Sequence, residues 1–527
     1  MKAPINILNK LFLGLAFILL FSCGGPTYDI LILNGSVYDG SGGAPIKADI
    51  AIKDSIIVAV GNLSDANATR IIDASGLAVS PGFIDMHTHL EPIMELLSCE
   101  SHVRQGVTTA LGGPDGNSPW PLKSHMDSLV EQGIGMNVAY LIGHNTVREN
   151  IMGLENRAPT AEELHAMEAE IDSAMQEGAY GISTGLKYLP GAFSKVDEVI
   201  ALSKVASKYG GIYTSHLREE GLGLFDAVQE AIQISAEADI PVVLTHHKAI
   251  GKPMWGKSVR TLAMVDSARA KGLDIKMDQY PYTASYTGIS VLIPSWSKAG
   301  GEEAFAERTK DPVLRDSIKN GIVFNILNDR GGSDLDRIQF ARVEWQPELE
   351  GKTLKYWAEE KGLEPTVENG ADLVIEAQLN GGAACVFHAM AEEDVTRIMQ
   401  HPQTMIGSDG RLVAPGMGHP HPRWYGTFPR VLGHYVREKK TLELSEAIRK
   451  MTLLPAQSLN ITDRGILKEG MRADITIFNP ETIIDKATFE KPHQYPEGID
   501  FVIVNGILAV DNGEFHDVRS GTVLRKK

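Results

Sequence analysis

The chain has 527 residues, of which 43% are hydrophobic and 22% are charged, so it is long enough for a large barrel with one or two smaller domains. Its net charge of −17 argues against a nucleic-acid partner, because phosphate contacts require Lys and Arg. The same charge repels anions at long range, so an anionic substrate would need local positive charge in its pocket.

The first 22 residues have the pattern of an export signal. Lys2 and Lys10 precede an apolar run at 11–21, which is too short to span a membrane comfortably. The run is followed by Ser22-Cys23, and this ending resembles a bacterial lipobox. An ordinary signal peptide with an incidental cysteine is the alternative. We therefore expect an exported bacterial lipoprotein that faces the periplasm or the cell surface. Its membrane contact would be a lipid anchor at Cys23 alone.

Both ends of the remaining chain read as short β-strands. An apolar strand at 28–33 is followed by Asn34-Gly35, a strong turn signal. Near the C-terminus, 473–478 and 501–506 have the same strand pattern. These two β-rich ends predict one composite β-domain, a small β-sandwich assembled from 28–80 and 464–527.

The middle of the chain alternates strands with helices. Thr160 and Glu163 have the spacing of a capping box, and Gly178 ends the helix that follows. Further helices, each followed by an apolar strand, are expected at 197–209, 225–238, 258–271 and 392–401. Repeating units of roughly 30 residues with buried strands predict a parallel sheet. Because the length accommodates eight units, we expect a TIM-like (β/α)8 barrel over 81–463, with the polar stretch 290–350 as a small inserted domain.

Histidine and aspartate side chains come at the ends of several predicted strands. They are His87, His89, His216, His246 and Asp409. In a barrel, the carboxyl ends of the strands converge on one face, and His87 and His89 point to the same side because they alternate. Any one of these residues alone would fit an ordinary core or surface position. Together they predict a metal centre, since imidazole is a natural zinc ligand. Asp409 is the candidate to take a proton from a metal-activated water and deliver it to a leaving nitrogen.

This strand-end pattern resembles the amidohydrolase superfamily, and within it the chain is similar to the N-acyl-D-amino-acid deacylases, or D-aminoacylases. The stretches that carry the resemblance are PGFIDMHTH at 81–89, RQGVTT at 104–109, GISTGL at 181–186, SHLR at 215–218, THHK at 245–248, YPY at 280–282 and HPRWYGTFPRVLG at 421–433. The resemblance covers nearly all of 28–527. It implies the (β/α)8 barrel, the β-domain from both chain ends and the small inserted domain.

The resemblance also implies a metal centre of one or two zinc ions. The implied ligands are His87, His89, Asp115, His216, His246 and Asp409. His87, His89 and Asp409 would form one metal site, with Asp409 doubling as general acid and base, and His216 and His246 would form the other. Asp115 stands where the family often has a cysteine, so it would ligate or bridge the metals as a carboxylate. A plain turn aspartate is the alternative at this position, and the metal number stays open.

Three further residues match positions that hold the substrate carboxylate in such enzymes: Lys248, Tyr282 and Arg423. An arginine fork with a lysine makes a charge-assisted clamp, which supplies the positive charge that this acidic chain otherwise lacks. Structural ion pairs are the alternative for the two cations. Tyr282 is preferred over Tyr280, and His247 is expected to point away from the site because it neighbours His246 on a strand.

The implied activity is hydrolysis of the amide bond of N-acyl-D-amino acids, which releases a carboxylate and a D-amino acid. The expected partner is therefore a small acyl-amino acid or a short peptide. A dipeptidase acting on a carboxyl-terminal D-residue is one alternative. A cyclic-amide hydrolase is another, but such relatives usually carry a modified lysine on strand 4, whereas here Lys187 lies beyond that strand. A non-catalytic lipoprotein that binds a ligand on a barrel scaffold is the alternative from a different class.

Overall fold

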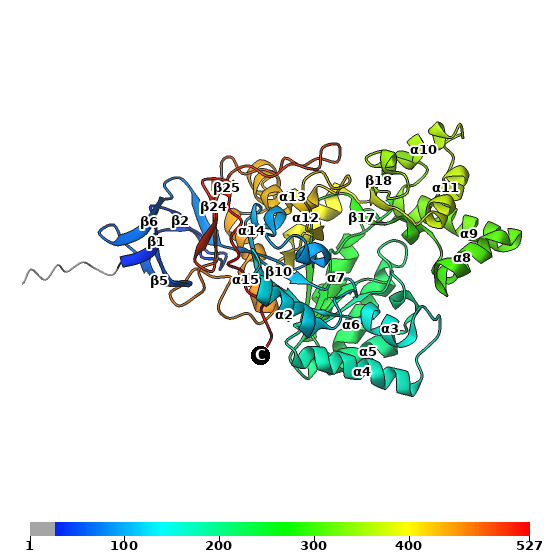
Figure 1. The fold of residues 1–527 in the computed structure, drawn as a ribbon, viewed down its shortest axis with the longest axis horizontal. Coiled ribbons are helices and arrows are strands. Elements are labelled where there is room, and N and C mark those ends of the chain that lie inside the picture. Colours follow the sequence, from blue (N-terminus) through cyan, green and yellow to red (C-terminus); the bar gives the residue numbers. More distant parts are fainter. Residues whose placement is uncertain (1–26) are drawn as a thin grey trace, which may run out of the picture.

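The structure is a computed structural model that describes residues 27–527, so the predicted export signal and Cys23 lie outside the described residues. Figure 1 shows an elongated molecule with a β-rich part at one end, a barrel in the middle and a helical part at the other end. The helices of that far part are α8 (Gly301–Lys310), α9 (Pro312–Asn325), α10 (Leu354–Glu360) and α11 (Val367–Leu379). Within 27–527, no helix is both long and apolar enough to cross a membrane.

The central part is a barrel of parallel strands. In order around it they are β8 (Phe83–Asp85), β10 (Val107–Gly112), β11 (Asn137–Tyr140) continued by β12 (Ile142–Gly143), β13 (Gly181–Gly185), β14 (Ile212–His216), β15 (Val242–Leu244), β16 (Ile275–Gln279) and β20 (Thr404–Ile406). The short strands β9 (Thr88–His89) and β21 (Gly410–Arg411) pair in parallel and close the ring between β20 and β8. The predicted (β/α)8 barrel is confirmed.

Helices connect the strands and cover the barrel. They are α1 (Glu100–Val103), α2 (Leu122–Gln132), α3 (His144–Met152), α4 (Ala161–Gln176), α5 (Val196–Ser207), α6 (Leu224–Ala238), α7 (Ser258–Ala270), α12 (Glu392–Gln400), α13 (Arg423–Arg430), α14 (Leu444–Met451) and α15 (Leu453–Ser458). The capping box predicted at Thr160 and Glu163 is present at the start of α4. The apolar faces of the barrel helices pack with the strands into one core around the barrel.

A buried carboxylate ties the last barrel strand to the first. Asp85, at the end of β8, accepts hydrogen bonds from the backbone N–H of His87 (3.1 Å) and of Ser408 (2.8 Å), and from the Ser408 hydroxyl. The backbone N–H of Asp409 donates to the carbonyl of His87 at 2.9 Å. These bonds hold Asp409 beside His87, although 321 residues separate the two strand ends.

The β-rich end combines strands from both ends of the chain. One sheet has the order β5-β4-β1-β6 and the other the order β25-β24-β23-β22-β7-β2-β3. The first half of the chain supplies β1 (Thr27–Leu33), β2 (Ser36–Val37), β3 (Ile46–Lys47), β4 (Asp49–Lys53), β5 (Ile56–Gly61), β6 (Asn67–Asp73) and β7 (Ala78–Pro81), and the second supplies β22 (Ile475–Phe478), β23 (Ile499–Val504), β24 (Ile507–Asp511) and β25 (Glu514–Phe515). A shared core between these sheets contains residues from both ends, such as Ile32 and Ile475.

The insertion between β16 and β20 has its own core. Its antiparallel sheet has the order β17-β19-β18, formed by β17 (Ser285–Gly288), β18 (Ile338–Arg342) and β19 (Ala384–Phe387). Its buried apolar residues run from Ile289 to Phe387, past the stretch 290–350 that the sequence pattern marks. The larger extent has a physical reason: β18 needs β19 as its hydrogen-bonding partner, and β19 comes only after α10 and α11.

Candidate metal centre

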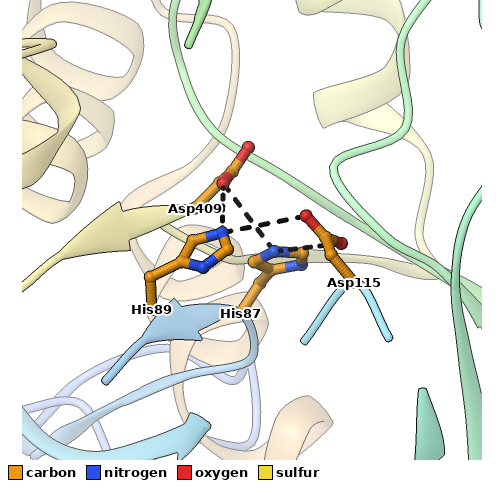
Figure 2. Close-up of side chains that lie close together, drawn as sticks. All are labelled: His87, His89, Asp115 and Asp409. Carbon is orange, nitrogen blue, oxygen red and sulfur yellow. Dashed lines mark ion pairs between the residues drawn. The ribbon is translucent and has the colours of Figure 1, made fainter. Parts of the chain in front are cut away.

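Four side chains from three loops at the carboxyl ends of the barrel strands converge in one group: His87, His89, Asp115 and Asp409 (Figure 2). The Oδ1 atom of Asp409 lies 3.3 Å from Nε2 of His89 and 3.7 Å from Nε2 of His87. Asp115 faces the same two rings from the other side, with Oδ1 3.5 Å from Nε2 of His87 and Oδ2 3.7 Å from Nε2 of His89. Strand ends that are distant in sequence thus bring two imidazoles between two carboxylates.

Asp115 also belongs to a second group, with His216 and His246. Its Oδ1 atom is 3.4 Å from Nε2 of His246, and its Oδ2 atom is 3.6 Å from Nδ1 of His216. Each carboxylate oxygen therefore faces one histidine of each group. Such a carboxylate has the geometry to bridge two adjacent ions.

The donor set fits zinc in both spacing and chemistry. With zinc–ligand bonds of about 2.0–2.2 Å, tetrahedral geometry places ligand atoms about 3.3–3.6 Å apart. The nitrogen–oxygen distances above, from 3.3 to 3.7 Å, match this spacing. Both ring nitrogens of His87 and of His216, and Oδ1 of Asp115, are buried without a hydrogen-bond partner. Buried polar atoms are normally satisfied, so these atoms are placed to bind a cation.

Three of these residues adopt a backbone conformation that side chains rarely take. The φ angles of Asp115, His246 and Asp409 are 54°, 37° and 47°. Left-handed backbone costs free energy in non-glycine residues, and it clusters where a functional geometry requires it. The fold therefore holds each of these side chains over the centre of the barrel at some local expense.

The centre carries an excess of negative charge. Burial raises the pKa of Asp409, but Arg423 and His89 outweigh this effect and hold that pKa below its ordinary value. Burial and Lys248 lower the pKa of His246, yet Asp115 and Glu220 raise it to about 9. The acids thus favour positive charge at the centre, whether as a proton or as a metal ion.

Glu220 is a site residue that the strand-end pattern did not single out. Its side chain is 3% exposed, and its Oε1 atom lies 2.6 Å from Nζ of Lys248 and 3.2 Å from Nδ1 of His246. Its Oε2 atom lies 3.6 Å from Nε2 of His216. The one signal in the sequence is its position four residues after His216, in SHLREE.

The two predicted substrate-binding cations are both paired with acids. Lys248 donates to Nδ1 of His246 at 2.6 Å in addition to its pair with Glu220. Arg423 Nη2 lies 2.9 Å from Oδ1 of Asp409. These contacts favour a positioning role for both, in which Arg423 orients the carboxylate of Asp409.

The structure also shows where the predicted substrate-binding residue Tyr282 and the neighbouring His247 lie. The hydroxyl of Tyr282 lies 3.5 Å from both the carbonyl of Pro422 and the carboxylate of Asp485, and Tyr282 is not among the residues that line the cavity. Tyr280 instead places its ring 4.6 Å from the Arg423 guanidinium. Neither tyrosine lines the cavity, so the structure does not bring Tyr282 to the predicted clamp. His247 points away from the centre, with Nε2 2.8 Å from Oγ1 of Thr261, as predicted.

A cavity of about 240 Å³ lies over the metal centre. Its walls include His89, Asp115, His216, Asp409 and three cations besides Lys248: Arg330, Arg411 and Arg423. An adjoining groove of about 890 Å³ shares Tyr286, Gly288, Arg411 and Trp424 with this cavity and is lined further out by a mixture of charged and apolar residues. The site thus offers a small inner space, where four cations face three acids of the metal centre, and a larger outer groove of mixed lining.

Comparison with known proteins places the chain among amide hydrolases. A model of the amidohydrolase family matches residues 70–289 and 364–510. D-aminoacylase from Alcaligenes xylosoxydans xylosoxydans is 35% identical over 523 residues, which cover 95% of this chain and 98% of that protein.

Two solved structures are similar over almost the whole chain. N-acyl-D-glutamate deacylase from Bordetella bronchiseptica, complexed with zinc and a phosphonate mimic of the tetrahedral intermediate, has a TM-score of 0.80 and 33% identity, covering 95% of this chain and 100% of that one. A D-aminoacylase structure that concerns a binuclear metal centre, with one-metal activation and second-metal attenuation, has a TM-score of 0.80 and 34% identity, covering 94% and 100%.

Proposed function

The chain belongs to the amidohydrolase family, and from that premise we propose that it hydrolyses the amide bond of N-acyl-D-amino acids, releasing a carboxylate and a D-amino acid. One observation carries the proposal: two groups of residues that could hold a metal ion share Asp115, and Asp115 lines a cavity that also contains four cations. Hydrolysis of an acyl-amino acid needs both features, because the carbonyl must be polarised and the substrate carries a carboxylate.

Zinc is the metal that this donor set and the zinc-bound relative favour. His87, His89, Asp115 and Asp409 would hold one ion, and Asp115, His216 and His246 would hold a second. When bound, zinc supplies a Lewis acid for the carbonyl and lowers the pKa of a water molecule towards neutrality.

The protein's own residues supply the proton transfers. Asp409 has a lowered pKa and is therefore ionised at neutral pH, so it can accept the proton of the attacking water. The same carboxyl group then delivers that proton to the amide nitrogen as the C–N bond breaks. Arg423 holds Oδ1 at 2.9 Å and keeps the carboxylate directed at the centre during both steps.

Peptides with a carboxyl-terminal D-residue are the second candidate substrates, because a long groove with several charged residues continues outward from the cavity. Its lining includes Glu91, Glu95, Arg342, Glu344 and Glu350, which suit a peptidyl group better than an apolar acyl chain. Cyclic-amide hydrolysis is disfavoured because Lys187 pairs with Glu219 at 2.8 Å, and β13 offers no lysine to bridge metals.

The test is turnover by the full chain, purified in detergent and loaded with zinc. We expect one or two zinc ions per chain and hydrolysis of N-acetyl-D-amino acids at least about 100-fold faster than their L-enantiomers, because a site that fixes the carboxylate, the scissile amide and the side chain of the substrate accepts a single hand. A chelator should reduce the rate by at least about 100-fold, and added zinc should restore it.

The result has two instructive alternatives. Zinc binding with turnover of dipeptides only would transfer the proposal to the second candidate. A folded protein that binds no zinc under these conditions would contradict the metal-dependent mechanism. It would favour the alternative of a non-catalytic lipoprotein that binds a ligand.

We further propose that the mature protein is an exported lipoprotein anchored at Cys23, which the lipobox-like residues 11–23 support. In a bacterial host, cells fed a labelled fatty acid should incorporate label into the full chain, which should then fractionate with membranes. Cys23→Ser should abolish the label and shift most of the protein to the aqueous fraction, since one anchor makes the whole contact. Label that persists in this variant would contradict the anchor position.

A further inference from the structure

Two of the cations around the cavity are already paired with acids. Lys248 contacts Glu220 and His246, both at 2.6 Å. Arg423 pairs with Asp409 at 2.9 Å. A buried cation without such a pair is therefore better placed to bind a substrate carboxylate.

Arg330 is a buried cation of the cavity without an acid partner in the described part of the chain. It lines the cavity together with the metal-centre residues, although its side chain is only 3% exposed. Its guanidinium donates one long hydrogen bond, from Nη1 to the Ser285 hydroxyl at 3.3 Å, and it lies 5.5 Å from the ring of Phe387. Across residues 27–527, no carboxylate lies within ion-pair distance of it. A buried charge without a partner is costly, so the fold must have a reason to retain it here.

The surrounding backbone is built to hold Arg330 at this place. It ends a π-helical turn, Ile326–Arg330, in the inserted part of the chain. Two glycines of the barrel loops let this turn approach: a Cβ atom at Gly251 would come within 1.8 Å of the Asn328 carbonyl, and one at Gly221 within 2.3 Å of the Asp329 carboxylate. The insertion is thus packed against the loops that carry Lys248 and Glu220, and it delivers its cation into the active-site cavity.

We propose that Arg330, assisted by Ser285, binds a carboxylate of the acyl-amino-acid substrate and thereby fixes the scissile bond over the metal centre. This inference rests on the proposed function. The planar guanidinium matches a carboxylate in bidentate geometry, and the pair gains strength because Arg330 is buried. Arg330 is a binding residue: it sets affinity and orientation, whereas Asp409 carries the proton.

The test compares matched substrates that differ only in charge. N-acetyl-D-leucine and its amide report on the α-carboxylate, and N-acetyl-D-glutamate and N-acetyl-D-glutamine report on a side-chain carboxylate. In the zinc-loaded full chain, Arg330→Met should raise KM for the charged member of one pair by about 10- to 100-fold, with kcat changed by less than about threefold. The pair that responds identifies the carboxylate that Arg330 binds.

Control variants separate this role from a structural one. Arg330→Lys should recover part of the lost KM, because it keeps the charge without the fork. Arg411→Met, which removes another cation from the same cavity, should leave the preference for the charged substrate unchanged. An unchanged preference in Arg330→Met, or its loss in Arg411→Met instead, would overturn the assignment.

A binding measurement keeps the inference separate from the proposed function. By calorimetry on an Asp409→Asn background, Arg330→Met should weaken binding of N-acetyl-D-leucine or N-acetyl-D-glutamate by the same 10- to 100-fold, about 1.4 to 2.7 kcal/mol. If the wild-type protein turned over none of the four compounds, the proposed function would fail. Equal binding of charged and uncharged ligands before and after the substitution would sink the Arg330 assignment alone.

Discussion

Asp409→Asn is expected to lower kcat by about 1,000-fold, within the range that a general acid and base contributes. The amide of asparagine has nearly the same shape as the carboxylate, but it neither accepts the proton of the attacking water nor donates one to the leaving nitrogen. KM should change much less than kcat, because the substrate carboxylate is held elsewhere. The measurement is steady-state kinetics alongside the zinc content of the variant.

The geometry makes this residue decisive. Its Oδ1 atom faces His89 and His87 at 3.3 and 3.7 Å, and the backbone of Asp409 is held to His87 by a 2.9 Å hydrogen bond. Because Arg423 outweighs the effect of burial and holds the pKa of Asp409 below its ordinary value, the group is a base at neutral pH. Its loss therefore removes the proton carrier and leaves the rest of the cavity in place.

A second carboxyl variant serves as the matched control. Glu91 contacts the far ring nitrogen of His89, Nδ1, at 3.0 Å and is partly exposed. Glu91→Gln retains an acceptor for that ring, so we expect a loss of about 10-fold or less. If Asp409→Asn and Glu91→Gln were equally mild, the role of Asp409 as general base would be refuted.

The sequence alone predicts that the histidines of the metal centre lie close together, because strand ends have a fixed direction in a barrel. His87, His216 and His246 each lie at or just beyond the end of a parallel strand, and all such ends meet on one face. Asp115 required the family resemblance, since an aspartate in a glycine-rich turn has no distinctive pattern by itself.

What the sequence did not predict depends on tertiary packing. Glu220 lies in a loop after β14, and only the approach of Lys248 from the next strand makes it part of the site. Arg330 lies in the insertion, whose position over the barrel depends on close contacts at Gly221 and Gly251. The choice between Tyr280 and Tyr282 depends on contacts made only in the folded chain: the Tyr280 ring faces Arg423, whereas the Tyr282 hydroxyl faces Asp485.

In protein loaded with two metal ions per chain, Asp115→Ala is expected to remove one of them. Without this carboxylate, the second group keeps only His216 and His246, whereas the first keeps His87, His89 and Asp409. Two ligands do not hold zinc tightly and three do, so the second ion should bind at least about 100-fold more weakly. Metal analysis after dialysis against a weak chelator measures this difference directly.

The activity of Asp115→Ala then shows which ion the reaction needs. A variant that keeps one ion and most of its rate would place the chemistry at His87, His89 and Asp409, with the second ion dispensable. A rate about 100-fold lower at full occupancy of the first group would mean that the bridging carboxylate or the second ion takes part in the chemistry. If metal content and affinity were unchanged, Asp115 would be a turn residue whose φ of 54° reflects loop geometry alone. The contacts of its two oxygens with four imidazoles would then be packing contacts, not metal ligation. Asp115→Asn distinguishes these cases further, because it retains the turn conformation and one ligating oxygen while removing the charge that lets a single carboxylate hold two cations together.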